Sequence, residues 1–192
     1  MVAVRQFDED EALHKIMEAF WREGFGATSI DDLVAATGLK RGSLYAAFGD
    51  KESMFLRAYR RYSEINEETL LDLLEAPEID QAVTAVFDKV IAKLEDPALP
   101  PGCLIANSLS EAAGRGDAIE AEARRSFARA EQALYERFLR AQAEGQLPPG
   151  RDLRALARFF NATLRSLAQV HRLTGDRQTV EDIARVALER IG

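Results

Sequence analysis

The residues best suited to chemistry in this chain are hydrogen-bond donors on one face of a short segment near position 40. At helical spacing, Leu44 and Phe48 fall on the opposite face, where they would anchor the segment in a core. Donors that point outward from an anchored helix can reach base edges and phosphates in the major groove of DNA. The pattern therefore favours contact with double-stranded DNA. The donors are Lys40, Arg41, Ser43 and Tyr45.

The flanking residues predict a helix-turn-helix that would hold this segment. We expect Thr28 to cap a short helix and Gly38 to end it, because these residue types favour those two positions. The next short helix is expected to begin at Lys40 and to end at Gly49. Asp50 would then cap a long third helix. Two short helices joined by a glycine turn are typical of DNA-binding helix-turn-helix units.

The stretch from Phe20, FWREGFGATSIDDLVAATGLKRGSLYAAFGDKESMF, resembles the N-terminal domain of the tetracycline-repressor (TetR) family of bacterial transcriptional regulators. The shared pattern is Phe-x-x-x-Gly-Phe, Thr-Ser-Ile, Ala-x-x-Gly-Leu and Gly-Ser-Leu-Tyr-x-x-Phe-x-x-Lys-Glu. The resemblance implies that Thr28, Tyr45 and Lys51 contact DNA phosphates. It also implies that three residues face base edges, namely Lys40, Arg41 and Ser43.

Composition agrees with a DNA partner only locally. The 192-residue chain has a net charge of −7, yet six basic residues stand against two acidic ones between Lys40 and Arg61. The positive charge is thus concentrated at the expected DNA face, and the acidic remainder would repel phosphate and limit non-specific binding. The single cysteine excludes an internal disulfide framework and favours a cytoplasmic location, and no apolar run approaches the roughly 20 residues of a membrane span.

Hydrophobic periodicity predicts an all-α fold of about nine helices without strands. We expect a three-helix DNA-binding domain over residues 1–50 and a ligand-binding and dimerisation domain over residues 51–192. The last two helices, over residues 152–191, form an amphipathic hairpin with more apolar surface than one face requires. Pairing two such hairpins about a two-fold axis would bury that surface in a four-helix bundle. The expected dimer-interface residues are Leu156, Leu164, Leu167, His171, Ile183 and Ala187.

A second group of residues could form a small-molecule site. Cys103, Asn107 and Glu111 are spaced by four and therefore share one helix face. An apolar wall with a few polar groups is what such a site needs, although each aromatic residue by itself could equally be ordinary core. The expected wall residues are Phe87, Ile91, Phe127 and Phe160. The motif Gly102-Cys-Leu-x-x-Asn107 resembles one found in a subgroup of TetR-type regulators.

Together these features favour a homodimeric repressor that binds a near-palindromic operator and is released by a small-molecule effector. An activator of the same fold is an alternative, and so is a sensor of electrophiles or oxidants through Cys103. With two histidines and one cysteine, neither a metal site nor another cofactor is expected. An enzyme with Cys103 as nucleophile is not favoured, because no spacing pairs the thiol with a base.

Overall fold

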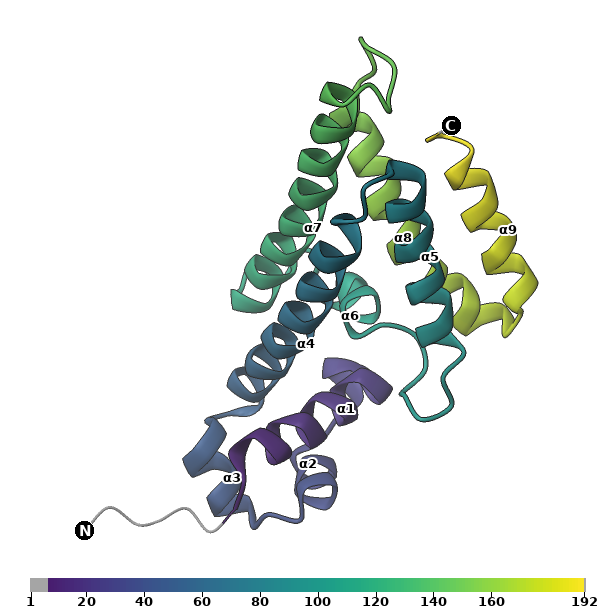
Figure 1. The fold of residues 1–192 in the computed structure, drawn as a ribbon. Coiled ribbons are helices and arrows are strands. Elements are labelled where there is room, and N and C mark those ends of the chain that lie inside the picture. The colour runs from purple at the N-terminus through teal and green to yellow at the C-terminus, as the bar shows by residue number, and fades with distance from the viewer. Residues whose placement is uncertain (1–6, 192) are drawn as a thin grey trace.

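The computed structural model describes residues 7–191, and within them it contains nine helices and no strand (Figure 1). The all-α prediction is therefore confirmed, and most helix boundaries agree within two residues. The helices are α1 (Glu9–Ala27), α2 (Ile30–Thr37), α3 (Arg41–Phe48), α4 (Lys51–Leu74), α5 (Ile79–Leu94), α6 (Leu104–Ala112), α7 (Ala118–Ala143), α8 (Leu153–Thr174) and α9 (Arg177–Leu188).

Helices α1–α3 lie at one end of the molecule, and the first half of α4 completes their core (Figure 1). This core is built on large side chains without exposed surface, among them Phe20, Leu33 and Leu44. Leu104 and Ile105 of α6 belong to the same core, although they follow it by many residues in the sequence. The end of the molecule that holds α1–α3 is thus packed directly against a helix from the C-terminal part.

A second core is formed by α5, α7, α8 and α9. Helix α4 contributes to both cores, because Tyr59 and Tyr62 lie in the first and Leu74 lies in the second. Figure 1 shows α4 and α7 running beside each other from the end that holds α1–α3 towards the far end, and the two helices are in contact. Helix α7 also contributes to both, with Ile119 and Ala123 in the first core and Leu134 in the second, so α4 and α7 together connect the two cores.

Most helix starts follow capping chemistry, in which a side-chain oxygen accepts a backbone N–H of the first turn. Asp50 accepts the backbone N–H of Ser53 and caps α4 as predicted. Asp176 caps α9, because its carboxylate accepts the N–H groups of Gln178 and Thr179.

Candidate functional site

The helix-turn-helix is formed by α2 and α3, and its local geometry corrects one sequence prediction. Ser29, and not Thr28, caps α2: its hydroxyl accepts the Asp32 N–H at 3.1 Å, while the Asp32 carboxylate accepts the Ser29 N–H at 2.7 Å. Gly38 ends α2 in the left-handed conformation with φ of 70°, which a side chain would disfavour. A short turn then leads from Gly38 into α3.

Helix α3 divides its residues between core and solvent. Leu44 is fully buried and Phe48 is 2% exposed, so both anchor the helix on the core beneath it. The face turned to solvent carries four donors, namely Lys40, Arg41, Ser43 and Tyr45. An anchored short helix with donors on its outer face has the geometry needed to enter a major groove.

Two of the expected DNA-contacting cations have neighbours in the free protein. The Arg41 guanidinium contacts Asp31 of α2 at 2.6 Å, and both side chains are largely exposed. The Lys51 ammonium lies 3.4 Å from the Gly26 carbonyl oxygen and 4.6 Å from the centre of the Phe25 ring. Contact with DNA would therefore require Arg41 to exchange a carboxylate for an acceptor on the nucleic acid.

Thr28 occupies a different environment from the other expected phosphate contacts. The residue is fully buried, and its hydroxyl donates to the Gly24 carbonyl oxygen at 2.6 Å. It ends α1 and does not open α2. Its side chain therefore offers no donor to a phosphate in this structure, whereas the cap that does open α2 belongs to Ser29.

The polar face of α6 meets the end of α1 in what we term the α1–α6 junction, formed by Trp21, Phe25, Gly102, Asn107 and Glu111. The Phe25 N–H donates to the Glu111 carboxylate at 2.9 Å, and the Trp21 indole N–H donates to the Gly102 carbonyl oxygen at 3.1 Å. The Asn107 amide donates weakly to the Trp21 carbonyl oxygen at 3.4 Å. Asn107 and Glu111, expected in a ligand site, therefore connect α6 to α1 at the end of the molecule that holds the helix-turn-helix.

The remaining expected ligand residues do not converge on one site. Phe87 and Phe160 pack against each other inside the second core, with ring centres 5.9 Å apart, and Ile91 lies in the same core. Cys103 is half-buried at the start of α6, and Phe127 lies over a shallow depression beside α6. None of the seven expected residues lines the main cavity of the described structure.

That cavity has a volume of about 490 Å³ and lies where α1, α4 and α5 meet. Trp21 and Tyr62 form part of its wall, and the Lys93 ammonium lies 4.9 Å and 4.3 Å from their ring centres. The sequence analysis did not predict this set, in which Trp21 is also a member of the first core and only 3% exposed. A signal was available, because Lys93 is a cation at helical spacing from the apolar residues Val86 and Val90.

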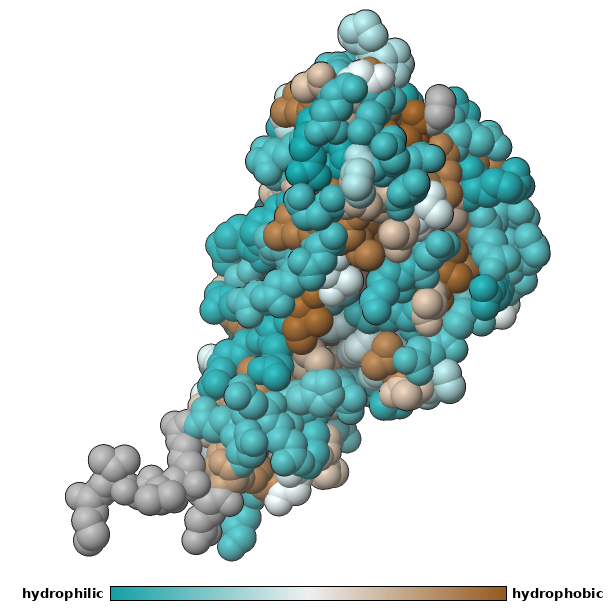
Figure 2. Space-filling model, viewed as in Figure 1, coloured by the Kyte–Doolittle hydropathy of each residue, from teal (hydrophilic) through white to brown (hydrophobic). Residues whose placement is uncertain are grey.

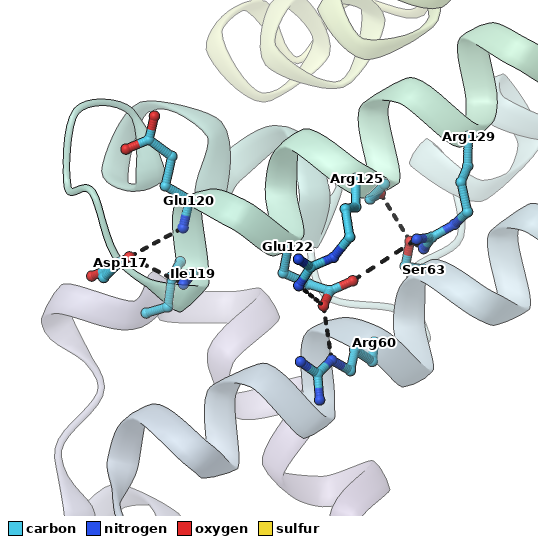
Figure 3. A network of polar contacts seen from close by, with 9 residues as sticks. Arg60, Ser63, Asp117, Ile119, Glu120, Glu122, Arg125 and Arg129 are labelled. Carbon is cyan, nitrogen blue, oxygen red and sulfur yellow. Dashed lines mark hydrogen bonds and ion pairs between the residues drawn. The ribbon is translucent and has the colours of Figure 1, made fainter.

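A polar network joins α4 to α7 beside the same cavity (Figure 3). The Glu122 carboxylate, only 5% exposed, accepts hydrogen bonds from Arg60 and Arg125, both at 2.8 Å. Burial opposes ionisation of Glu122, but these hydrogen bonds outweigh it and lower the pKa of the carboxyl. The Ser63 hydroxyl donates to Ser126 at 2.9 Å, which adds a second link between the helices.

The expected dimer residues separate into two groups. Leu156, Leu167 and Ala187 are buried within the core of the single chain. Leu164 and Ile183 are only partly buried at the edge of that core. His171 is also partly buried, and its Nε2 lies 2.6 Å from the Glu95 carboxylate at the end of α5 in the same chain. The large apolar residues that α8 and α9 leave exposed are Phe159, Leu173 and Val186.

The described helices include none that is long and apolar enough to cross a membrane. Comparison with protein families gives two matches. Residues 12–58 match the family described as bacterial regulatory proteins, tetR family, and residues 81–187 match the tetracyclin repressor-like C-terminal domain.

Individual relatives are similar over nearly the whole chain. An uncharacterized HTH-type transcriptional regulator, YezE of Bacillus subtilis, is 32% identical over 96% of each chain. The HTH-type transcriptional repressor ComR of Escherichia coli is 32% identical over 84% of this chain and 78% of its own. A cysteine mutant of the regulator CifR, solved in complex with 26-bp operator DNA, superposes with a TM-score of 0.90 at 26% identity, covering 98% of this chain and 99% of that chain. With both family matches in place, the chain belongs to the TetR family of bacterial transcriptional regulators.

Proposed function

We propose that this protein is a homodimeric transcriptional repressor that binds a near-palindromic operator and leaves it when a small-molecule effector binds. The proposal depends on the two faces of α3: one face buries Leu44 and Phe48, and the other exposes hydrogen-bond donors to solvent. A relative with the same fold has been solved on operator DNA. In a dimer, each α3 would occupy the major groove of one half-site, about one helical turn of DNA from the other.

We assign base recognition to Arg41 and phosphate contact to Lys51 and Tyr45. Arg41, whose guanidinium is exposed, would read a guanine edge by a bidentate hydrogen bond once it leaves Asp31. Lys51 and Tyr45 would contact phosphates, which sets affinity and register without reading sequence. These assignments predict two distinct mutant phenotypes on the same operator.

The test uses genomic fragments selected by the purified protein, followed by anisotropy titrations at several salt concentrations. Lys51→Ala should weaken binding to all sequences and reduce the salt slope by about one. Arg41→Ala should relax preference at one operator position, worth about 1–3 kcal/mol. If both variants lose affinity uniformly at every operator position, Arg41 contacts a phosphate and the assignment fails.

Dimerisation is proposed to use the outer faces of α8 and α9. Both helices leave large apolar side chains exposed, with Phe159 at 44% and Val186 at 46%. A charge at Val186 should therefore prevent association without disturbing the protomer core, because the side chain has no buried position to lose. Val186→Glu is expected to sediment as a monomer. The matched control is Leu71→Glu on α4, where the leucine is equally exposed at 46%, and this variant should remain a dimer.

Effector release would follow from the way that the two cores share α4. A ligand that shifts α4 relative to α1 changes the spacing of the two α3 helices, so ligand and operator oppose each other through one coupling free energy, typically about 1–3 kcal/mol. We also assign the chain to the subgroup with the Gly-Cys-Leu-x-x-Asn motif. In support, Gly102 has φ of 80°, and a Cβ there would lie only 3.2 Å from the Asn107 side-chain oxygen, so both the backbone conformation and the space beside Asn107 favour glycine at the first motif position.

A further inference from the structure

The cavity between α1, α4 and α5 has the size of a small-molecule site. Its volume of about 490 Å³ falls within the roughly 300–1,000 Å³ of known ligand pockets. Hydrophobic residues come to the surface between α4 and α5 in the space-filling view, and the rest of this face is mainly hydrophilic (Figure 2). The apolar lining includes Met17, Leu70, Leu73, Val86, Val90 and Ile105.

Cations line this apolar space without carboxylate partners of their own. The Lys93 ammonium hydrogen-bonds Asn66 at 2.8 Å and otherwise lies over aromatic rings. The buried Nε of Arg165, on α8, has no hydrogen-bond partner. Within residues 7–191, no carboxylate lies within ion-pair distance of Lys93 or Arg165. A negatively charged group in this apolar cavity would therefore stabilise Lys93 and Arg165.

The acidic residues of the lining are engaged elsewhere. Glu67 pairs with Arg129 of α7 at 2.7 Å, and Asp96 accepts the Ala98 N–H at 2.9 Å. Burial lowers the pKa of Lys93 to about 8, and the neighbouring cations Lys89 and Arg165 add to this effect, while Cys103 opposes it. The protonated ammonium is thus under-stabilised in the free protein, and an incoming anion would stabilise it.

We propose that the effector is an amphipathic organic anion, with its carboxylate at Lys93 and Arg165 and its apolar body along α4 and α5. The inference rests on the proposed function, because it specifies the effector of the same switch. It also explains how the signal would reach DNA, since His14, Met17 and Trp21 of α1 line the cavity. The bound acid would touch the DNA-binding end directly.

Trp21 provides the readout, since it is the only tryptophan of the chain and lines the cavity. Octanoate, decanoate, dodecanoate and naphthoate are titrated into the full-length protein while the intrinsic fluorescence is recorded. Decanoate should bind at least about tenfold more tightly than its uncharged methyl ester, because the ester lacks the charge-assisted contact. Decylamine, with the same body and a positive charge, should not bind.

Lys93→Met keeps the length of the side chain and removes the charge, so it is expected to fold, which circular dichroism verifies. This variant should lose about tenfold in affinity for the acid and little for the ester, so that the preference between them disappears. Lys15→Met is the matched control. Lys15 lies on the outer surface of α1, pairs with Glu11 at 2.6 Å and does not line the cavity, so this variant should behave as the wild type.

Binding of the ester as tightly as the acid overturns the proposal. So does unchanged acid affinity in Lys93→Met, or the absence of Lys93-dependent binding throughout the acid series. Operator binding is measured separately by anisotropy, which keeps the two hypotheses apart. If the acid binds in a Lys93-dependent manner but does not release DNA, the organic-anion site is supported, and effector release is contradicted. If other molecules release the operator and the acids do not bind, the organic-anion site is contradicted, and the proposed function of effector release is not.

Discussion

Replacing Gly24 by alanine should weaken the α1–α6 junction and destabilise the protein. Gly24 has φ of 82° and ψ of 173°, a backbone conformation that is essentially restricted to glycine. A Cβ at this position would lie 2.8 Å from the Glu111 Oε1 atom, which is inside contact distance. The same carboxylate accepts the Phe25 N–H at 2.9 Å, so its displacement also removes a hydrogen bond.

The magnitude has three parts. Backbone strain at such a position costs of order 1–3 kcal/mol. Loss of the hydrogen bond to Glu111 costs about 1 kcal/mol, at the low end for a charged acceptor because this side chain is exposed. Alanine restricts the unfolded chain and returns about 0.4–1 kcal/mol. Gly24→Ala should therefore lower the free energy of unfolding by about 1–3.5 kcal/mol.

Urea unfolding followed by circular dichroism measures this change, and the chain offers a matched control two residues away. At Gly26 a Cβ would lie 3.6 Å from the same Glu111 oxygen, an ordinary contact, and φ is not positive. Gly26→Ala should therefore leave stability unchanged or raise it by a few tenths of a kcal/mol. Repeating Gly24→Ala in a Glu111→Ala background removes the steric conflict and should leave only the strain, so a double-mutant cycle should give a coupling of about 1 kcal/mol.

Two results would refute this reasoning. Equal effects of alanine at Gly24 and Gly26 would mean that the positive φ carries no strain. A coupling of zero between Gly24 and Glu111 would mean that the carboxylate does not hold α6 against the end of α1. In that case the α1–α6 junction could not transmit a movement of α6 to α1.

Two further predictions concern charged groups beside the cavity. Glu122→Gln should lower the free energy of unfolding by about 1–2 kcal/mol at neutral pH, since it loses two charge-assisted bonds from partly exposed arginines. Because the pKa of Glu122 is lowered in the folded protein, urea titrations should show this difference fading as the pH falls through the acid range; an equal difference at all pH values would contradict the assignment. Lys93, with a pKa lowered from 10.5 to about 8, should make the wild type more stable by about 2 kcal/mol at pH ~9.5 than at pH ~7.5, since the unfolded chain binds the extra proton in this window. Thermal or urea unfolding of Lys93→Met over the same range should lack this rise, and an identical rise in both proteins would show that another group causes it.

The sequence by itself determined the helices and the recognition face. Helix periodicity and helix ends depend on residues within a few positions of each other, so Asp50 could be recognised as a cap from its neighbours. The same holds for α3, where the spacing of Leu44 and Phe48 predicts which face is buried. The position of a helix cap is less certain where two adjacent residues can both act as the cap. Both Thr28 and Ser29 could cap α2, and the backbone bend at Gly24 decided between them, because it lets the Thr28 hydroxyl bond to the Gly24 carbonyl.

Only the tertiary structure decided which faces meet. An apolar stripe shows that a helix face is buried without naming its partner, and α6 illustrates this, since its polar residues Asn107 and Glu111 meet α1 and not a ligand cavity. The cavity itself combines Trp21, Lys93 and Arg165, which are separated by about 70 residues each along the chain and approach only through the packing of α1, α5 and α8. Long-range packing of this kind depends on how all nine helices fill the two cores together, and no local pattern in the described chain encodes it.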